Sequence, residues 1–129
     1  YEQQKLLAHM AVSYREINTS GEVARILGIG AFCVDPDFQS RQIASTLLQT
    51  VEAAACATHI DYLVLIADEH GLYKKNGFQL QENTCRWLMI NKQQTLGVGH
   101  RNISESLMVK ALGKKKWATG LVDFLGPIF

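Results

Sequence analysis

The stretch between residues 34 and 44 contains the side chains and backbone groups best suited to hold an anion. It joins a predicted strand to a predicted helix and reads Val34-Asp35-Pro36-Asp37-Phe38-Gln39-Ser40-Arg41-Gln42-Ile43-Ala44. At such a junction the unpaired backbone N–H groups and the positive end of the helix dipole point to one place. The small side chains of Ser40, Ala44 and Ser45 let a phosphate approach the backbone, and Arg41 adds a positive charge. An ordinary strand-to-helix turn capped by Ser40 is the alternative on these grounds.

Two other polar segments favour no such site. Gly97-Val98-Gly99 lacks the strand-to-helix context and the following Gly-Lys-Ser/Thr of a phosphate loop. The basic run Gly113-Lys114-Lys115-Lys116-Trp117 is short, and we expect a solvated turn there rather than a nucleic-acid site.

The three cysteines, Cys33, Cys56 and Cys85, are an odd number with no C-x-x-C spacing, which fits neither a disulfide framework nor a zinc site. We therefore expect no metal, and a reducing, cytoplasmic environment.

Length and composition predict one globular domain. The 129 residues are enough for one hydrophobic core and too few for two ordinary domains. Hydrophobic residues make up 47% of the chain, and 13 Lys and Arg against 12 Asp and Glu leave a formal charge of +1. That balance provides no general basic field for nucleic acid. The longest apolar run, Tyr62 to Ala67, is far shorter than the ~20 residues of a membrane span, and no signal peptide is visible. We expect neither a nucleic-acid nor a membrane partner.

The elements that would position residues 34–44 begin with a predicted hairpin. Leu6 to Ile17 is expected to be a long strand, because β-branched and aromatic residues are common in it. Asn18-Thr19-Ser20-Gly21 supplies four turn formers, and Glu22 to Ile26 resumes as a strand.

The strand that leads directly into the anion-binding stretch contains two glycines. It is expected to run from Leu27 to Val34 and includes Gly28 and Gly30. Glycine inside a strand marks a bulge or a close approach of another molecule to the backbone. Simple packing of the two glycines is an equal alternative.

Downstream of the junction, helix and strand alternate. A helix is expected from about Arg41, with an apolar stripe made by Ile43, Leu47, Leu48, Val51, Ala54 and Ala55. Tyr62 to Ala67 is a continuous apolar run of strand length, suited to burial on both faces. Asp68 is predicted to cap a short helix that ends at Asn76, with Gly77 in the left-handed C-terminal position.

Beyond Phe78 the pattern predicts two more strands. They are Cys85 to Ile90 and Ser106 to Leu112, separated by a polar segment from Asn91 to Glu105. The order from the junction onward is therefore helix, strand, short helix and strands.

The junction resembles the acyl-CoA signature of the GNAT acyltransferase superfamily. In that family a strand and Val-x-Pro precede Arg/Gln-x-x-Gly-x-Gly/Ala; Gln39 matches the first position and Ala44 the last, whereas Gln42 stands where the family usually has glycine. A second motif, Gly71-Leu72-Tyr73-Lys74-Lys75-Asn76-Gly77-Phe78, is similar to the family's Phe-Tyr-x-x-x-Gly-Phe segment and lies at the expected distance. The resemblance covers about Leu6 to Leu80. The long hairpin looks most like those of the nodulation N-acyltransferases and of the aminoglycoside-modifying, survival-type acetyltransferases.

The resemblance implies an α/β (α+β) fold of GNAT type, a central mixed, mostly antiparallel sheet flanked by helices, with acetyl-CoA as the acyl donor. The backbone of Phe32, Cys33 and Val34 would pair with the pantetheine arm as an added strand would. The pyrophosphate would be held by the backbone N–H groups of Gln39, Ser40, Arg41, Gln42, Ile43 and Ala44. An amine of a small molecule or peptide would attack the thioester carbonyl directly, and Tyr73 would protonate the departing thiolate. The alternative role for Tyr73 is a buried aromatic of a short helix.

The general base is not identified by these patterns. Some family members carry a glutamate on the strand before the tyrosine helix, but Leu63-Val64-Leu65-Ile66 has no carboxylate. His9, Glu69 and His70 could act through water, and each also fits an ordinary structural role. Because of this gap, and because Gln42 replaces glycine, a catalytically weak acyl-CoA-binding or assembly module is the alternative to an N-acyltransferase.

The resemblance also predicts that residues 1–129 form a single GNAT-like domain that is an incomplete version of the fold. Leu6 falls at the second strand of the family fold, so the usual first strand and first two helices would be missing. We expect either an uncovered sheet edge or a partner chain over it, such as a second copy in a homo-oligomer.

Overall fold

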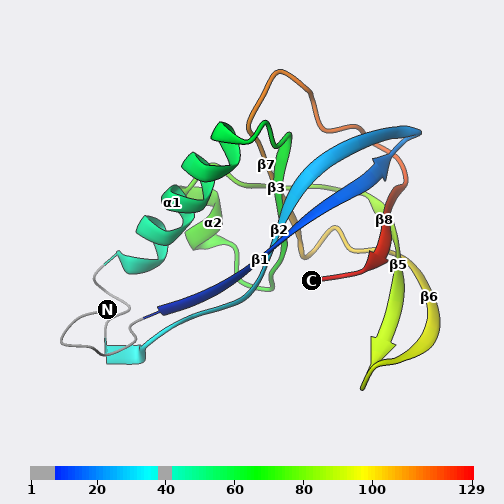
Figure 1. The fold of residues 1–129 in the computed structure, drawn as a ribbon, viewed down its shortest axis with the longest axis horizontal. Coiled ribbons are helices and arrows are strands. Elements are labelled where there is room, and N and C mark those ends of the chain that lie inside the picture. Colours follow the sequence, from blue (N-terminus) through cyan, green and yellow to red (C-terminus); the bar gives the residue numbers. More distant parts are fainter. Residues whose placement is uncertain (1–7, 38–41) are drawn as a thin grey trace.

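An eight-stranded sheet runs through the residues that this computed structural model describes, 8–37 and 42–129 (Figure 1). The elements in chain order are β1 (Ala8–Thr19), β2 (Glu22–Val34), α1 (Ile43–Ala57), β3 (Tyr62–Ile66), α2 (Gly71–Lys75), β4 (Gln79–Leu80), β5 (Thr84–Asn91), β6 (Gln94–Asn102), β7 (Leu107–Ala111) and β8 (Val122–Pro127). The strands are ordered β4-β7-β3-β2-β1-β8-β5-β6. Among neighbouring strands, β2 with β3 and β5 with β8 are parallel, and the other pairs are antiparallel. The predicted mixed, mostly antiparallel sheet is confirmed.

β1 and β2 form one long hairpin. Ser20 and Gly21 make its turn with φ angles of 51° and 92°, the left-handed conformation that two-residue hairpin loops favour. The prediction of two separate strands that meet at Leu27 is wrong. The antiparallel ladder to β1 continues without a break through Gly28 and Ile29, so β2 is a single strand.

The end of β2 that leads to α1 is bulged. In the ladder to β1, Ala31 and Phe32 lie opposite the single residue Met10. Ala31 has a φ of 48°, in the left-handed region. Bulges re-aim side chains and are common beside functional sites, and the residues at and after this one, Phe32, Cys33 and Val34, line the same cavity as residues of α2.

Gly28 and Gly30 lie just before this bulge and also allow a close approach. A Cβ atom on Gly28 would lie 2.4 Å from the ring of Phe129, and one on Gly30 would lie 3.3 Å from the Phe129 carbonyl carbon. The molecule that approaches the two glycines is therefore the C-terminal part of the same chain.

Two hydrophobic clusters pack on the sheet, and β3 contributes to both. Tyr62 and Val64 belong to the first cluster, while Leu63 and Leu65 belong to the second, together with Leu48 of α1. Successive residues of a strand point to opposite faces, so the burial of all four confirms that the apolar run 62–67 is covered on both faces.

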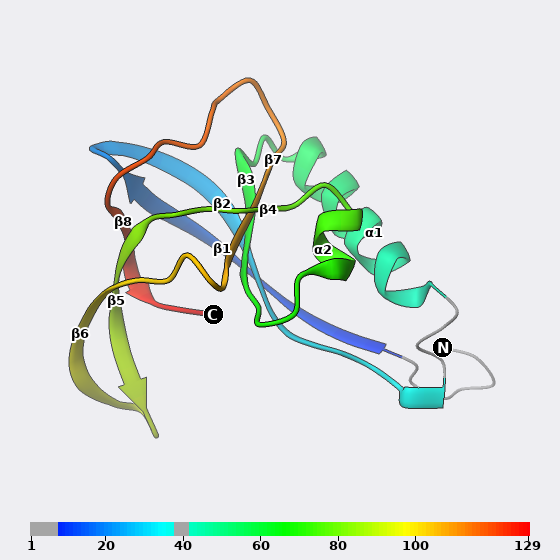
Figure 2. The ribbon, with the colours of Figure 1, turned by 180° about the vertical axis from the view of Figure 1, so that it is seen from behind.

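α1 and α2 lie together beside β3 and β7, whereas β5, β6 and β8 form the other end of the molecule (Figures 1 and 2). Of the predicted apolar stripe, Leu48 and Ala55 are buried, but Ala54 is exposed. Neither helix is long and apolar enough to cross a membrane, among the residues described.

Two further predictions are corrected by the structure. Asp68 does not cap the short helix, because α2 begins only at Gly71 and has His70 at its N-cap. The polar segment 91–105 contains β6, whose exposed polar residues and glycines hide the strand pattern at the outer edge of the sheet. The expected left-handed residue after the short helix is confirmed, since Gly77 has a φ of 91°.

Candidate functional site

A cavity of about 510 Å³ opens where the end of β2 meets the starts of α1 and α2. Its lining residues come from three separate segments and are Phe32, Cys33, Val34, Ala44, Glu69, Leu72 and Tyr73. The structure therefore brings predicted donor-binding residues of β2 and α1 together with Tyr73. Gln42 and Ile43 directly precede the lining residue Ala44 at the start of α1 but do not line the cavity, while Gln39, Ser40 and Arg41 lie outside the described residues.

The start of α1 suits an anion. Gln42 occupies the N-cap position, but its side chain makes no capping hydrogen bond, and the first turn contains no acidic residue. The first N–H groups of a helix have no partner within the helix, so they and the helix dipole favour a negative charge at this end.

Gln42 adopts the backbone conformation that explains the family's preference for glycine at this position. Its φ of 58° and ψ of 23° are left-handed. Glycine takes this conformation freely, whereas a residue with a side chain is strained by about 1–2 kcal/mol. At this one residue the chain therefore has the conformation that glycine favours, although it carries a glutamine.

The cavity lies where the pairing of β2 with β3 stops. Their parallel ladder runs from Ile26 and Tyr62 to Ile29 and Leu65. β2 continues to Val34, whereas β3 ends at Ile66. Beyond Ile29 the two strands are no longer paired with each other, and the bulged end of β2 contributes to the cavity wall instead.

Tyr73 is packed between two other aromatic rings. The ring centroid of Phe32 lies 6.4 Å from that of Tyr73, and the centroid of Phe78 lies 5.9 Å from it. Burial among these side chains raises the pKa of the Tyr73 phenol above its ordinary value of 10.0, because the charged form loses its hydration. The phenol is therefore protonated at neutral pH and can donate a proton.

The three candidate bases occupy different places. The Nδ1 of His9 donates to the Ala31 carbonyl at 3.0 Å, and the Nε2 of His70 donates to the Ala67 carbonyl at 3.0 Å. Each ring then has its other nitrogen available as an acceptor. Of the three, only the exposed Glu69 lines the cavity.

Two side chains of the cavity have roles that the sequence patterns did not reveal. Phe32 was predicted to act only through its backbone, yet its ring packs against Tyr73. Leu72 also lines the cavity, and its position next to Tyr73 in the second motif was the available signal. No group of three or more His, Cys, Asp or Glu side chains that could hold a metal is present in residues 8–37 and 42–129.

Comparison with known families identifies the class of protein. The family model for the acetyltransferase (GNAT) domain matches residues 1–80, which is more than half of the chain. This chain belongs to the GNAT acetyltransferase family. The match includes both motifs that meet at the cavity, while no curated protein matches the chain.

Solved structures show the same fold. A GNAT family N-acetyltransferase (YhbS) from Escherichia coli, in complex with CoA, aligns with a TM-score of 0.68 and 20% identity over 95% of this chain and 62% of the bacterial protein. A GCN5-related N-acetyltransferase from Anabaena variabilis aligns with a TM-score of 0.60 and 23% identity over 64% of this chain and 21% of its own. Eis1 from Mycobacterium abscessus aligns with a TM-score of 0.60 and 16% identity, over 64% of this chain and 22% of its own. The chain thus spans less than two thirds of the length of each of these proteins.

Proposed function

We propose that this chain binds acetyl-CoA and transfers its acetyl group to a primary amine of a small molecule or peptide. The observation that carries the proposal is the cavity in which the bulged end of β2, the first turn of α1 and Tyr73 meet. A strand end suits the pantetheine arm, a helix start suits the phosphates, and a phenol suits the leaving thiolate. The E. coli relative was solved in complex with CoA, which supports the same donor for this chain.

The donor would be held by backbone groups from two elements. Phe32, Cys33 and Val34 would pair with the pantetheine arm, as the resemblance implies. The pyrophosphate would lie at the start of α1, against N–H groups of the 39–44 stretch. This placement would leave the thioester beside Tyr73, since the tyrosine lines the cavity between these two segments.

The reaction we propose is direct attack. The amine nitrogen forms a bond to the thioester carbonyl carbon, the C–S bond breaks, and its electron pair stays on sulfur. Tyr73 gives its proton to that sulfur, and the proton lost by the amine goes to Glu69 through water. Glu69 is assigned as the base because its side chain is the only carboxylate among the described residues that line the cavity. Holding the amine and the thioester together supplies most of the acceleration.

Release of free CoA from acetyl-CoA in the presence of a panel of amines tests this function. Binding of acetyl-CoA without turnover, together with no effect of Tyr73→Phe, would favour the non-catalytic acyl-CoA-binding module that Gln42 and the missing carboxylate on β3 also fit. Absence of acetyl-CoA binding would overturn both functions.

We further propose that a second copy of the chain covers the outer edge of β1. Among residues 8–37 and 42–129, β8 pairs with β1 only at Asn18 and Thr19, and Val12 and Tyr14 on the rest of β1 are 49% and 55% exposed. An open edge with exposed apolar residues favours pairing with another chain. Light scattering of the purified chain should show a dimer, and Val12→Lys should return it to the monomer.

The exposed thiols of Cys33 and Cys56 favour a reducing, cytoplasmic compartment.

A further inference from the structure

α2, the helix that carries Tyr73, is too short to hold itself in place. It has only five residues, whereas isolated helices shorter than about 12 residues are marginal in water. None of its residues is fully buried, and His70 at its N-cap makes no side-chain capping hydrogen bond. The position of the Tyr73 hydroxyl therefore depends on what ties α2 to the rest of the chain.

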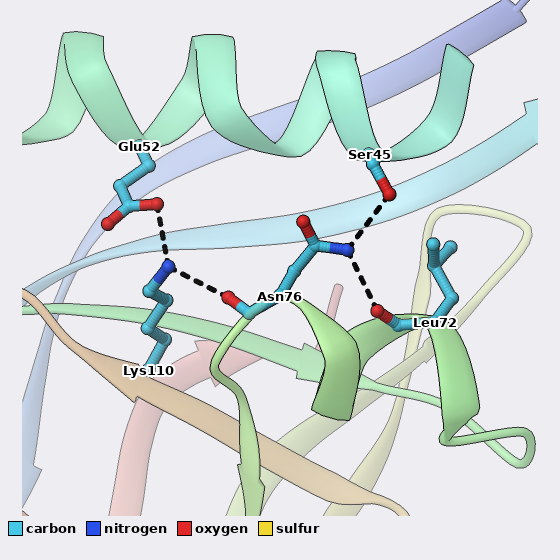
Figure 3. A network of polar contacts seen from close by, with 5 residues as sticks. All are labelled: Ser45, Glu52, Leu72, Asn76 and Lys110. Atoms are coloured by element: carbon cyan, nitrogen blue, oxygen red, sulfur yellow. Dashed lines mark hydrogen bonds and ion pairs between the residues drawn. The ribbon is translucent and has the colours of Figure 1, made fainter. Parts of the chain in front are cut away.

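The C-terminal end of α2 is tied to β7 and α1 by Lys110. Its Nζ lies 2.8 Å from the carbonyl oxygen of Asn76, the C-cap residue of α2, and 2.6 Å from Oε2 of Glu52 on α1 (Figure 3). Both charged side chains are largely buried, with 21% of the Lys110 side chain and 33% of that of Glu52 exposed. A cation also suits this end of a helix, where carbonyl groups lack partners.

The side chain of Asn76 makes a second tie to α1. Its Nδ2 donates to Oγ of Ser45 at 3.1 Å and to the carbonyl of Leu72 at 2.9 Å. Ser45 and Glu52 are seven residues apart, about two turns of α1, so they lie on the same side of the helix. Figure 3 shows Asn76 and Lys110 facing this side of α1.

Gly77 provides the space that Lys110 occupies. A Cβ atom at Gly77 would lie 3.0 Å from Cε and 3.2 Å from Nζ of Lys110. A side chain there would push the ammonium away from Asn76, and the φ of 91° also disfavours any side chain at this position.

We propose that Lys110 and Asn76 are positioning residues that set the distance between the Tyr73 hydroxyl and the start of α1. Ser45 belongs to the first turn of α1, which is the proposed phosphate site, and Leu72 immediately precedes Tyr73. Asn76 therefore connects the element that holds the donor's phosphates to the element that protonates its thiolate. Both ties fix α2 against α1, so the main consequence of this network for the proposed reaction is geometric.

Because this inference rests on the proposed function, its test includes a measurement that needs no turnover. Lys110→Met removes both contacts of the ammonium, and Lys110→Arg keeps the charge. Lys115→Met is the matched control, since Lys115 also forms an ion pair, with Asp61 at 3.4 Å, but contacts neither helix in the described structure. Ser45→Ala removes one hydrogen bond from Asn76 and is mild enough to leave the chain folded.

The expected result of Lys110→Met is a fall in kcat on the order of tenfold, with the KM for acetyl-CoA changed by less than about twofold. Ser45→Ala should lower kcat in the same direction by a smaller factor, Lys110→Arg should restore part of the loss, and Lys115→Met should leave kcat unchanged. Independently of turnover, the absorbance titration of Tyr73, taken as the difference between each protein and its Tyr73→Phe counterpart, should move toward the ordinary value near 10 in Lys110→Met, because α2 loosens and the phenol becomes hydrated.

The positioning role is overturned if Lys110→Met and Ser45→Ala both titrate at Tyr73 as the unmodified chain does while they remain folded. If the unmodified chain shows no turnover with any amine, but the Tyr73 titration still shifts in Lys110→Met, the proposed function has failed and the positioning role stands. Amide hydrogen exchange in residues 71–76 provides the same comparison, with faster exchange expected in both variants and not in Lys115→Met.

Discussion

The aromatic rings of Phe32 and Tyr73 lie 6.4 Å apart between their centroids and are tilted by 59°. Phe32 comes from the bulged end of β2 and Tyr73 from α2, so this contact joins the strand proposed to bind the donor with the proposed proton donor. Phe32 is one of the side chains around Tyr73, whose burial raises the pKa of the phenol above its ordinary value of 10.0. The contact therefore bears on both the position and the pKa of Tyr73.

Replacing Tyr73 with phenylalanine should remove the proton donor and retain most of the aromatic packing. We expect kcat to fall by about 10²-fold or more, with little change in acetyl-CoA binding, because general acid catalysis contributes on this scale. Free CoA release measures kcat, and calorimetry measures binding. Leu72→Ala is a useful comparison, since it alters the same cavity without touching the phenol. A kcat for Tyr73→Phe within about twofold of the unmodified chain would exclude this role.

Gln42→Gly should retain or strengthen acetyl-CoA binding. Gln42 is already in the left-handed conformation, so glycine removes a strain of about 1–2 kcal/mol and can keep the same φ and ψ at this residue. The thermal midpoint should stay the same or rise, and Gln42→Ala, which keeps the strain and shortens the side chain, is the control. A large loss of binding in Gln42→Gly alone would mean that binding needs the backbone restraint that a side chain at residue 42 provides. A loss in both variants would mean that the glutamine amide contacts acetyl-CoA.

The three thiols should react differently with an alkylating reagent at pH 8. Cys33 and Cys56 are exposed and Cys85 is buried, so only the first two should be labelled in the folded chain. Cys33 lines the cavity and Cys56 lies near the far end of α1. Acetyl-CoA should therefore slow the labelling of Cys33 and leave that of Cys56 unchanged, as peptide mass spectrometry can measure. Equal protection of both, or of neither, would place the donor elsewhere.

The buried thiol of Cys85 should make the chain less stable in alkali. Burial raises its pKa from 9.0 to about 12. Above pH 9 the unfolded chain loses this proton while the folded chain keeps it, so the stabilisation is complete below pH 9 and is lost as the pH rises toward 12. The free energy of unfolding should fall by at most about 1.4 kcal/mol per pH unit from this group. Denaturant unfolding at pH 8 to 10.5 measures the slope, and Cys85→Ala should flatten it; an identical slope in that variant would assign the effect to other groups.

Much of the site was predictable because its signals are local. The 34–44 junction and the 71–78 motif each depend on a few neighbouring residues, and the left-handed Gly77 follows from the end of a short helix. Burial of the 62–67 run on both faces also follows from its composition. By contrast, β6 was not predicted, since an edge strand pairs on one side only and its polar, glycine-containing sequence has no alternating pattern.

The sequence by itself indicated the family to which the chain belongs and the residues we propose to carry the chemistry, because both are read from short motifs of neighbouring residues. Only the tertiary structure decided how Lys110 holds the Asn76 carbonyl across 34 residues, how Phe129 covers Gly28, and which candidate base lines the cavity. Those contacts depend on strand order and register throughout the sheet. No local pattern encodes them, since each requires segments far apart in the chain to pack in one particular arrangement.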